Sequence, residues 1–332
     1  MTSVQVGDLV GAAVKSAILL VLLLTACAYM TLLERRLLAR FQLRHGPNRV
    51  GPFGLLQPLA DGIKLIFKEN FVPAGADVIV YWVAPALSMI AALFVYAVIP
   101  IGPEVRIFGQ TIPLRLSDPN VGVLLVLGAS SIGVYGVILG GWSVNNKYSL
   151  LGSLRSSAQL ISYELAIGLA VVSVVLTADS LSLVQIVEAQ RRVWFVALQP
   201  VAFIIFMIGA FAETNRAPFD LPEAEQELIA GFQTEYGGFK FAMFYIGEYV
   251  GVVTMSLLAS TLFFGGWHGP LLPGPLWVVI KTLIFASFFI WIRATLPRVR
   301  HDQLMALGWK VLIPLGLLNV VATAVVITLT GG

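Results

Sequence analysis

Acidic side chains gather in one short stretch of the sequence, between two apolar segments. Six carboxylates fall between residues 213 and 235, and Arg216 and Lys240 are the cations beside them. The six are Glu213, Asp220, Glu223, Glu225, Glu227 and Glu235. Such a density of acids suits proton transfer, because repulsion and burial of a pair such as Glu223 and Glu227 would raise the pKa of at least one of them towards neutrality.

Part of this acidic stretch has a simpler explanation. Asp220 and Glu223 have the spacing of a capping box, and a proline is tolerated in the first turn of a helix. A short helix is therefore predicted to begin near Leu221, where its dipole would stabilise acids at its N-terminus. This explanation leaves Glu225, Glu227 and Glu235 unaccounted for.

Charged side chains also occur inside apolar segments. Glu164 and Glu248 would lie well below a membrane surface, where an ionised carboxylate costs about 2.5–3.5 kcal/mol. They form either a hydrogen-bonded structural pair or a proton-carrying site, and the nearby Glu213 favours protons. Lys281, inside another apolar segment, either extends towards the surface or pairs with a buried acid.

The composition assigns the chain to the membrane. Of its 332 residues 58% are hydrophobic and 12% are charged, and the mean hydropathy is +0.88. Soluble proteins have about 25% charged residues. We therefore expect a single membrane domain, residues 1–332, since no polar stretch is long enough to form a core of its own.

Cysteine and histidine usage bears on cofactors. Cys27 is the single cysteine, which excludes internal disulfides, and the three histidines are scattered without metal-ligand spacing. We expect no metal site and no cofactor bound by this chain. The formal charge of +3 does not indicate nucleic acid, because the basic residues lie beside apolar segments.

The elements that must position these charges are membrane helices. Segments of about 20 apolar residues, enough to cross roughly 30 Å of hydrocarbon, recur eight times. The predicted fold is an all-α polytopic membrane protein with eight transmembrane helices. The spans are 14–33, 78–100, 121–142, 160–178, 194–212, 241–264, 276–294 and 310–329.

The loop charges predict the topology. Assigning loops alternately to the two sides places fifteen Lys and Arg residues on one side and five on the other, with Lys281 inside a span. The richer side is expected to be cytoplasmic, so both termini are predicted to lie outside a bacterial plasma membrane. The acidic loop at about 213–240 would then be cytoplasmic.

A further helix is predicted at about 54–69. Leu59, Ile63 and Ile66 share one face, whereas Asp61 and Lys64 lie on the other. The segment is too short and too polar to span, so it fits an amphipathic helix in the membrane interface. It would either cover the ends of other helices or form a wall beside an entrance for a lipid-soluble molecule.

Four long motifs of this chain together resemble those of a known protein family. They are TLLERRLLARFQ (31–42), RHGPNRVGPFGLLQPLADGIK (44–64), KYSLLGSLRSSA (147–158) and ETNRAPFDLPEAEQELIAGFQTEY (213–236). In these motifs and their order the chain resembles the H-type membrane subunits of the proton-pumping NADH:quinone oxidoreductase, respiratory complex I.

The resemblance implies an eight-helix subunit under a hydrophilic arm, with a quinone chamber shared with two hydrophilic subunits. NADH, FMN and iron-sulfur clusters would belong to partner subunits, and proton-pumping membrane subunits would be neighbours. The implied quinone-chamber residues are Arg216, Phe219, Glu213, Glu225, Glu227 and Arg36. The implied proton-path residues are Glu213, Glu223, Glu227, Glu235, Glu248 and Glu164.

One departure and three rival functions accompany the resemblance. Some relatives have an acid in the third span where this chain reads ASSIG (129–133), so a proton route would pass by water, serine or another residue. One rival is the equivalent subunit of a related hydrogenase or other complex I superfamily assembly. A second is a self-contained proton-coupled transporter, disfavoured because no internal repeat is found. The third is a purely structural scaffold, which has no use for carboxylates at depth.

Overall fold

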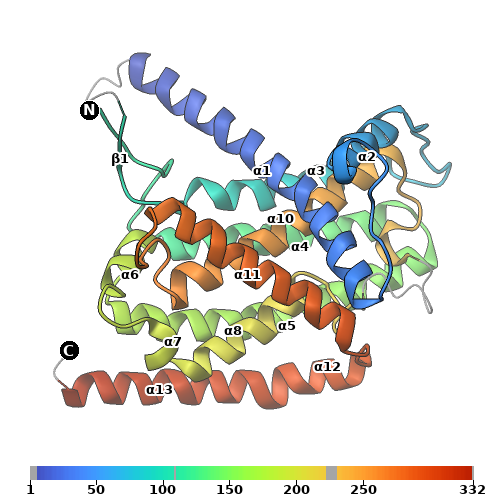
Figure 1. Cartoon of the computed structure of the whole chain (residues 1–332). Coiled ribbons are helices and arrows are strands. Elements are labelled where there is room, and N and C mark those ends of the chain that lie inside the picture. Colours follow the sequence, from blue (N-terminus) through green and yellow to red (C-terminus); the bar gives the residue numbers. More distant parts are fainter. Residues whose placement is uncertain (1–5, 108–109, 222–229, 331–332) are drawn as a thin grey trace.

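The computed structural model describes residues 6–107, 110–221 and 230–330 as a bundle of long helices. Figure 1 shows most of them running along a common direction, with α1 tilted across the bundle. Backbone groups in hydrocarbon must be paired internally, and helices achieve this within one segment. The helices are α1 (Val6–Phe41), α2 (Gln57–Phe67), α3 (Val78–Phe94), α4 (Gly122–Ser143), α5 (Lys147–Ala178), α6 (Leu183–Ala189), α7 (Phe195–Leu198), α8 (Pro200–Glu213), α10 (Gly238–Phe263), α11 (Gly274–Thr295), α12 (His301–Leu307) and α13 (Ile313–Thr330).

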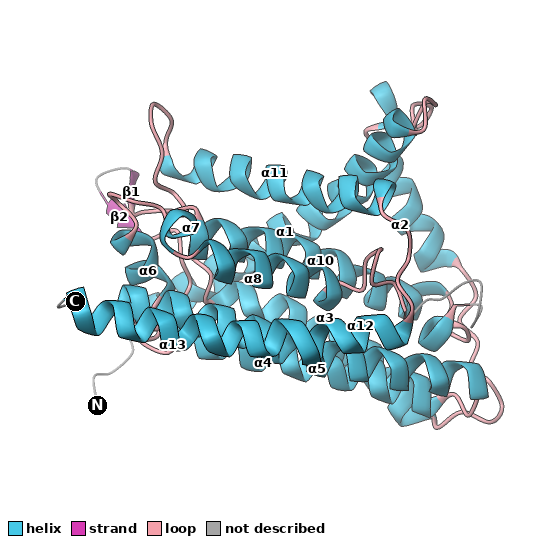
Figure 2. Ribbon diagram, turned by 90° about the horizontal axis from the view of Figure 1, so that it is seen from below, coloured by secondary structure: helices cyan, strands magenta, loops and turns pink. Residues whose placement is uncertain are grey.

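Shorter elements complete the described part of the chain. The 3-10 turns are Pro52–Gly54, Val95–Ala97 and Gly231–Gln233, and a π-helical turn, Gly308–Leu312, joins α12 to α13. Strands β1 (Val105–Ile107) and β2 (Gln110–Ile112) pair antiparallel. Figure 2 shows this small hairpin at one end of an otherwise helical molecule. The predicted all-α class is therefore confirmed.

Seven helical segments are long and apolar enough to cross a membrane within the described parts of the chain. They correspond to seven of the eight predicted spans. The span predicted at 194–212 instead forms α7 and α8, which are separated at Gln199. With 14 residues, α8 is about 21 Å long, short of the roughly 30 Å of a hydrocarbon core. Pro200 explains the break, because proline begins a helix well and cannot continue one.

The bundle has two distinct ends. The hairpin end carries β1, β2, α6 and the loop 264–273, and α1 begins and α13 ends there (Figure 1). The α2 end carries α2, residues 214–221 and α12. Helix α2 lies within the predicted 54–69 segment, and Leu59, Ile63 and Ile66 are exposed along it. Its location in a membrane interface remains a prediction.

Helix α10 organises the packing. It is the most buried of the long helices and contacts α1, α3, α8 and α11. Helix α5 begins earlier than the predicted span, at Lys147, where the Asn146 side chain accepts a hydrogen bond from Tyr148 N. It packs against α4, α8 and α13. Glu164 on α5 and Glu248 on α10 are thereby held inside one assembly.

Close packing of α3 against α4 predicts a sensitivity at Gly136. A β-carbon there would lie 2.8 Å from Ser88 N and 2.9 Å from Ala84 O. Gly136→Ala is expected to lower the free energy of unfolding by about 1–3 kcal/mol, because neither backbone atom can move freely. Thermal unfolding of the purified protein measures the loss. Gly128→Ala, on the same helix in open space, is the control, and equal melting temperatures for the two variants would contradict the packing.

Candidate functional site

Arg216 is the centre of a buried ion network. It follows α8, and only 6% of the residue is exposed. Its Nη1 donates to Glu34 Oε1 of α1 at 2.9 Å, and its Nε lies 2.8 Å from Glu248 Oε1 of α10. Its guanidinium carbon lies 4.4 Å from the ring centroid of Tyr249. The arginine therefore links the residues after α8 to both helices.

A second cation completes the network. Arg293, near the end of α11, donates from Nη1 to the same Oε1 of Glu34. Glu34 is 4% exposed, so its charge is buried between two guanidinium groups. With Glu248, the network contains two acids and two bases, which balances its formal charge. Buried charges need such partners, because an uncompensated one carries a large desolvation penalty.

The protonation state of Arg216 follows from this environment. Burial alone would lower the pKa of the guanidinium, but Glu248 and Glu34 hold that pKa well above its ordinary value. Arg216 therefore remains charged throughout the physiological range. Arg216 is therefore not the group of this network that exchanges protons.

Glu248 also borders a cavity. A volume of about 120 Å³ lies among α3, α4, α8 and α10, with Glu213, Glu248, Ser130 and Thr254 among its lining residues. Among the described residues no partner is found for the buried Oε2 of Glu213. A cavity of this volume with several polar groups can hold more than one water molecule, each needing two to four partners. Water is therefore the natural partner of that oxygen.

Glu164 lies beside the cavity rather than in its lining. Its Oε1 accepts hydrogen bonds from Ser130 Oγ, at 3.5 Å, and from Ser131 Oγ. Ser130 itself lines the cavity. The serines of α4 thus join Glu164 to the space that contains Glu213 and Glu248.

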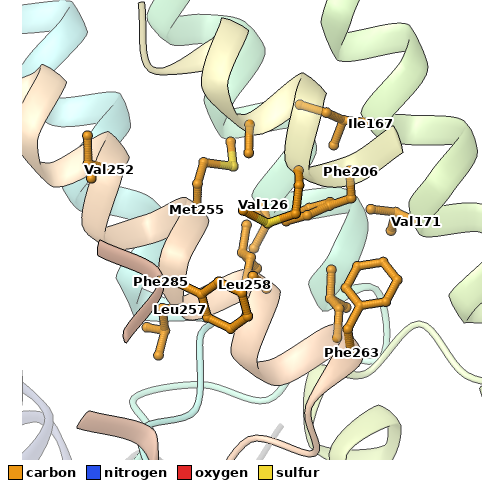
Figure 3. Close-up of a cluster of buried hydrophobic side chains, with 14 of the residues drawn as sticks. Val126, Ile167, Val171, Phe206, Val252, Met255, Leu257, Leu258, Phe263 and Phe285 are labelled. Carbon is orange, nitrogen blue, oxygen red and sulfur yellow. The ribbon is translucent and has the colours of Figure 1, made fainter. Parts of the chain in front are cut away.

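Towards the hairpin end the polar lining stops. A neighbouring apolar layer includes Val126, Met255, Leu258 and Phe206. Figure 3 shows these side chains closely grouped with Ile167, Val171 and Phe263. The small void of about 30 Å³ within this layer shares Ser130 and Thr254 with the larger cavity. On the hairpin side the polar cavity is therefore bordered by an apolar layer.

Comparisons with known proteins bear on this arrangement. A family model described as NADH dehydrogenase matches residues 14–324. The second H-type NADH-quinone oxidoreductase subunit of Geobacter sulfurreducens is 59% identical over 93% of this chain and 94% of its own length. The H-type subunits of Protochlamydia amoebophila and Thermomicrobium roseum are 58% and 55% identical, over 90% and 93% of this chain and 92% and 94% of their own lengths.

This chain belongs to the family of H-type NADH-quinone oxidoreductase subunits. It is a multi-pass membrane component of that multisubunit enzyme, and other subunits of the complex are its partners. The family model covers five of the seven apolar helical segments completely and most of the first and the last.

Several residues predicted for the site of an H-type subunit meet in the structure. Glu213 and Glu248 share the cavity, and Glu164 reaches it through serine. Arg216 joins them through Glu248. The third span therefore offers serine in place of an acid, one of the alternatives that the sequence left open. The described residues do not include Glu223, Glu225 or Glu227. The helix predicted to begin near Leu221 also falls largely outside them.

Other predicted residues of this H-type chain lie elsewhere. Phe219 packs against Tyr163, with ring centroids 5.7 Å apart. Arg36 contacts the carbonyl oxygen of Phe53 in the loop after α1. Glu235 accepts a hydrogen bond from Asn146 Nδ2 at 2.7 Å, beside the α4–α5 turn. Phe219, Arg36 and Glu235 are not among the cavity-lining residues in the described parts of the chain.

The two buried lysines are held by carbonyl groups and aromatic rings. Lys281 Nζ donates to the carbonyl oxygens of Phe264, Gly266 and His268 at 2.6–2.8 Å, so it binds the loop after α10. Lys240 donates to the carbonyl of Phe71 and lies over the rings of two aromatic residues of α3, Tyr81 and Trp82. These rings stabilise its charge by cation–π contact. No ion pair with an acid is found for either lysine within the described residues.

Glu34 is the site residue that the sequence interpretation missed. In the sequence it marks the polar end of the first span, yet in the structure it contacts both buried arginines. The sequence does not reveal this role, because Glu34 directly precedes Arg35 and Arg36 and adjacent opposite charges are usual at a membrane surface. Among the described residues no group of three His, Cys, Asp or Glu side chains is arranged to hold a metal ion.

The buried network predicts the effect of removing its centre. Arg216→Met is expected to lower the free energy of unfolding by about 3–5 kcal/mol, because Glu34 and Glu248 would lose a buried counter-charge. Adding Glu248→Gln to Arg216→Met is expected to restore part of this loss. Thermal unfolding of the purified complex would measure both changes.

The matched control is Arg300→Met. Arg300 pairs with Asp302 on the surface, where such pairs contribute about 0–1 kcal/mol. Equal melting temperatures for Arg216→Met and the Arg300→Met control would contradict the proposed importance of the buried network.

Proposed function

We propose that this subunit forms one wall of the quinone chamber and couples quinone reduction to proton movement. Residues 213–240 would face hydrophilic partner subunits, which complete the chamber and hold FMN and the iron-sulfur clusters. Reduction of quinone to quinol consumes two electrons and two protons. The acids and Arg216 of this chain would respond to the negative charge that develops on the quinone after the electrons arrive and before the two protons are taken up.

One observation carries this proposal: Glu248 belongs to both the ion network and the cavity. It lies 2.8 Å from Arg216 Nε and also lines the cavity with Glu213. A shift of Arg216 towards Glu34 would leave Glu248 less compensated and favour its protonation. Charge at the chamber and protonation in the cavity would therefore change together.

The onward route runs from the cavity to Glu164. Water in the cavity would connect Glu213 with Glu248, and Ser130 and Ser131 would pass protons to Glu164. Proton-pumping membrane subunits are the proposed next neighbours. The apolar layer around Val126, Met255 and Leu258 opposes an exit towards the hairpin end.

The orientation proposed from the loop charges fits this route. The α2 end would be cytoplasmic, and the hairpin end with both termini would lie outside the plasma membrane. Helix α2, with its exposed apolar side chains, would rest in the cytoplasmic interface beside a quinone entrance. High identity to NADH-quinone oxidoreductase subunits favours NADH as the electron source over a hydrogenase assembly.

The first functional test replaces the two cavity acids. Glu213→Gln and Glu248→Gln are each expected to slow NADH-driven quinone reduction and proton uptake about tenfold or more, because a positioned proton-transfer group contributes a factor of roughly 100 or greater. Both rates are measured on the intact complex in proteoliposomes. Glu104→Gln, an exposed acid at the hairpin end, is the control. Wild-type rates in both cavity variants would refute the assignment.

The second functional test concerns the serines of α4. The double change Ser130→Ala and Ser131→Ala removes both donors to Glu164 while leaving every acid in place. Proton translocation per NADH oxidised is expected to fall about twofold or more, whereas Ser16→Ala, on the exposed part of α1, should leave it unchanged. An unaltered ratio of protons to NADH in the double variant would exclude serine from the route.

A further inference from the structure

A large apolar groove separates α8 from α11 on the outside of the bundle. Its volume is about 730 Å³, within the range of sites that bind small molecules. Phe203 and Phe211 of α8 face Phe285 and Phe288 of α11, with ring centroids 6.2 and 5.9 Å apart. The groove is distinct from the cavity that contains Glu213 and Glu248, and the proposed function does not use it.

The groove follows the thickness of a membrane. Trp277 lines it near the hairpin end and Leu296 near the α2 end. Leu296, directly after α11, is nineteen positions beyond Trp277, which corresponds to about 28 Å along a helix and nearly equals a hydrocarbon core of about 30 Å. The facing helix α8 is too short to cover this length. Ile204 and Ile284 in the groove are more than half exposed, so another apolar molecule must cover them.

The lining residues distinguish between a lipid and a partner helix. Helices that associate in membranes use Gly, Ala, Ser and Thr, which allow close approach of the backbones. None of these four types lines the groove in the described parts of the chain, where the lining is mainly aromatic and branched aliphatic. This composition favours a flexible acyl chain, which can follow the spaces between such side chains, over a closely packed partner helix.

Basic side chains at the hairpin end indicate that the lipid headgroup is anionic. Arg191 and Arg192 are exposed and closely precede Trp194, which lines the groove. Lys281 is unavailable to a ligand, because its three ammonium donors already bind three carbonyl oxygens. Arg191 pairs with Glu188, which leaves Arg192 as the better candidate for a phosphate contact. Tryptophans such as Trp194 suit the interface between chain and headgroup.

We infer that this groove binds an anionic phospholipid, with one acyl chain between α8 and α11 and the phosphate near Arg192. The lipid would come from the leaflet at the hairpin end of the bundle. It would fill the part of the membrane thickness that α8 leaves uncovered.

The test uses the intact complex in nanodiscs of phosphatidylcholine, with a trace of photoactivatable phosphatidylglycerol carrying a diazirine on its acyl chain. After illumination, labelled peptides are mapped by mass spectrometry. The phosphatidylglycerol probe is expected to label α8 and α11 about fivefold more than the matching phosphatidylcholine probe, the factor expected for one arginine beside an anionic headgroup. Equal labelling by the two probes would refute the headgroup assignment.

Two variants separate the contributions of chain and headgroup. Ile204→Trp fills the groove and should reduce labelling of both helices severalfold, whereas Leu318→Trp, on the exposed face of α13, should not. Arg192→Gln lies on the surface and should abolish the preference for phosphatidylglycerol while the labelling by phosphatidylcholine remains. Labelling unaffected by Ile204→Trp would refute the site.

Two further outcomes would assign the groove to another occupant. A photo-crosslinking amino acid at Ile284 that links to a neighbouring subunit would show that protein covers it. Displacement of the phosphatidylglycerol probe by added quinone, but not by unlabelled phosphatidylglycerol, would identify a quinone tail instead. If Ile204→Trp fails to assemble, Arg192→Gln and the Ile284 cross-link still decide between these outcomes.

Discussion

Arg216 is a charged side chain in a buried position, and the arrangement around it follows from the need to compensate that charge. Glu34 supplies one carboxylate from α1 and Glu248 another from α10, while Arg293 of α11 balances Glu34. Replacing such a network by apolar residues often costs little stability, but removing one member costs a great deal. The network therefore fixes how these helices meet more than it adds to stability.

The same network places a titratable group at the boundary between two environments. Glu248 faces Arg216 on one side and the polar cavity on the other. Beyond Ser130 and Thr254 the interior becomes the apolar layer of Val126 and Met255. An ion that enters from the α2 end therefore meets the polar cavity first and then this apolar layer. This asymmetry favours sideways transfer through Glu164 over a direct crossing.

The sequence predicted the elements more completely than their contacts. Hydropathy alone locates seven membrane helices, because each must bury its backbone within about 20 apolar residues. It does not reveal the division of the 194–212 segment, where the composition is mostly apolar but the helix is interrupted at Gln199 and Pro200. Glu248 and Glu164 were identifiable from their cost in a membrane, whereas Glu34 was not, since its partners Arg216 and Arg293 lie 182 and 259 residues away. Pairing across such separations depends on packing, which periodicity does not encode.

Helix α11 connects the site to the membrane-facing groove. At the α2 end Arg293 holds it to Glu34, and at the hairpin end Lys281 holds it to the carbonyls after α10. Between these two attachments its outer face borders the groove opposite α8. A groove whose wall is fixed at both ends is formed before any lipid arrives, so binding costs little ordering of the protein. Because one of those attachments belongs to the ion network, weakening that network should loosen the groove as well, which links the two features physically although the network and the groove lining have no residue in common.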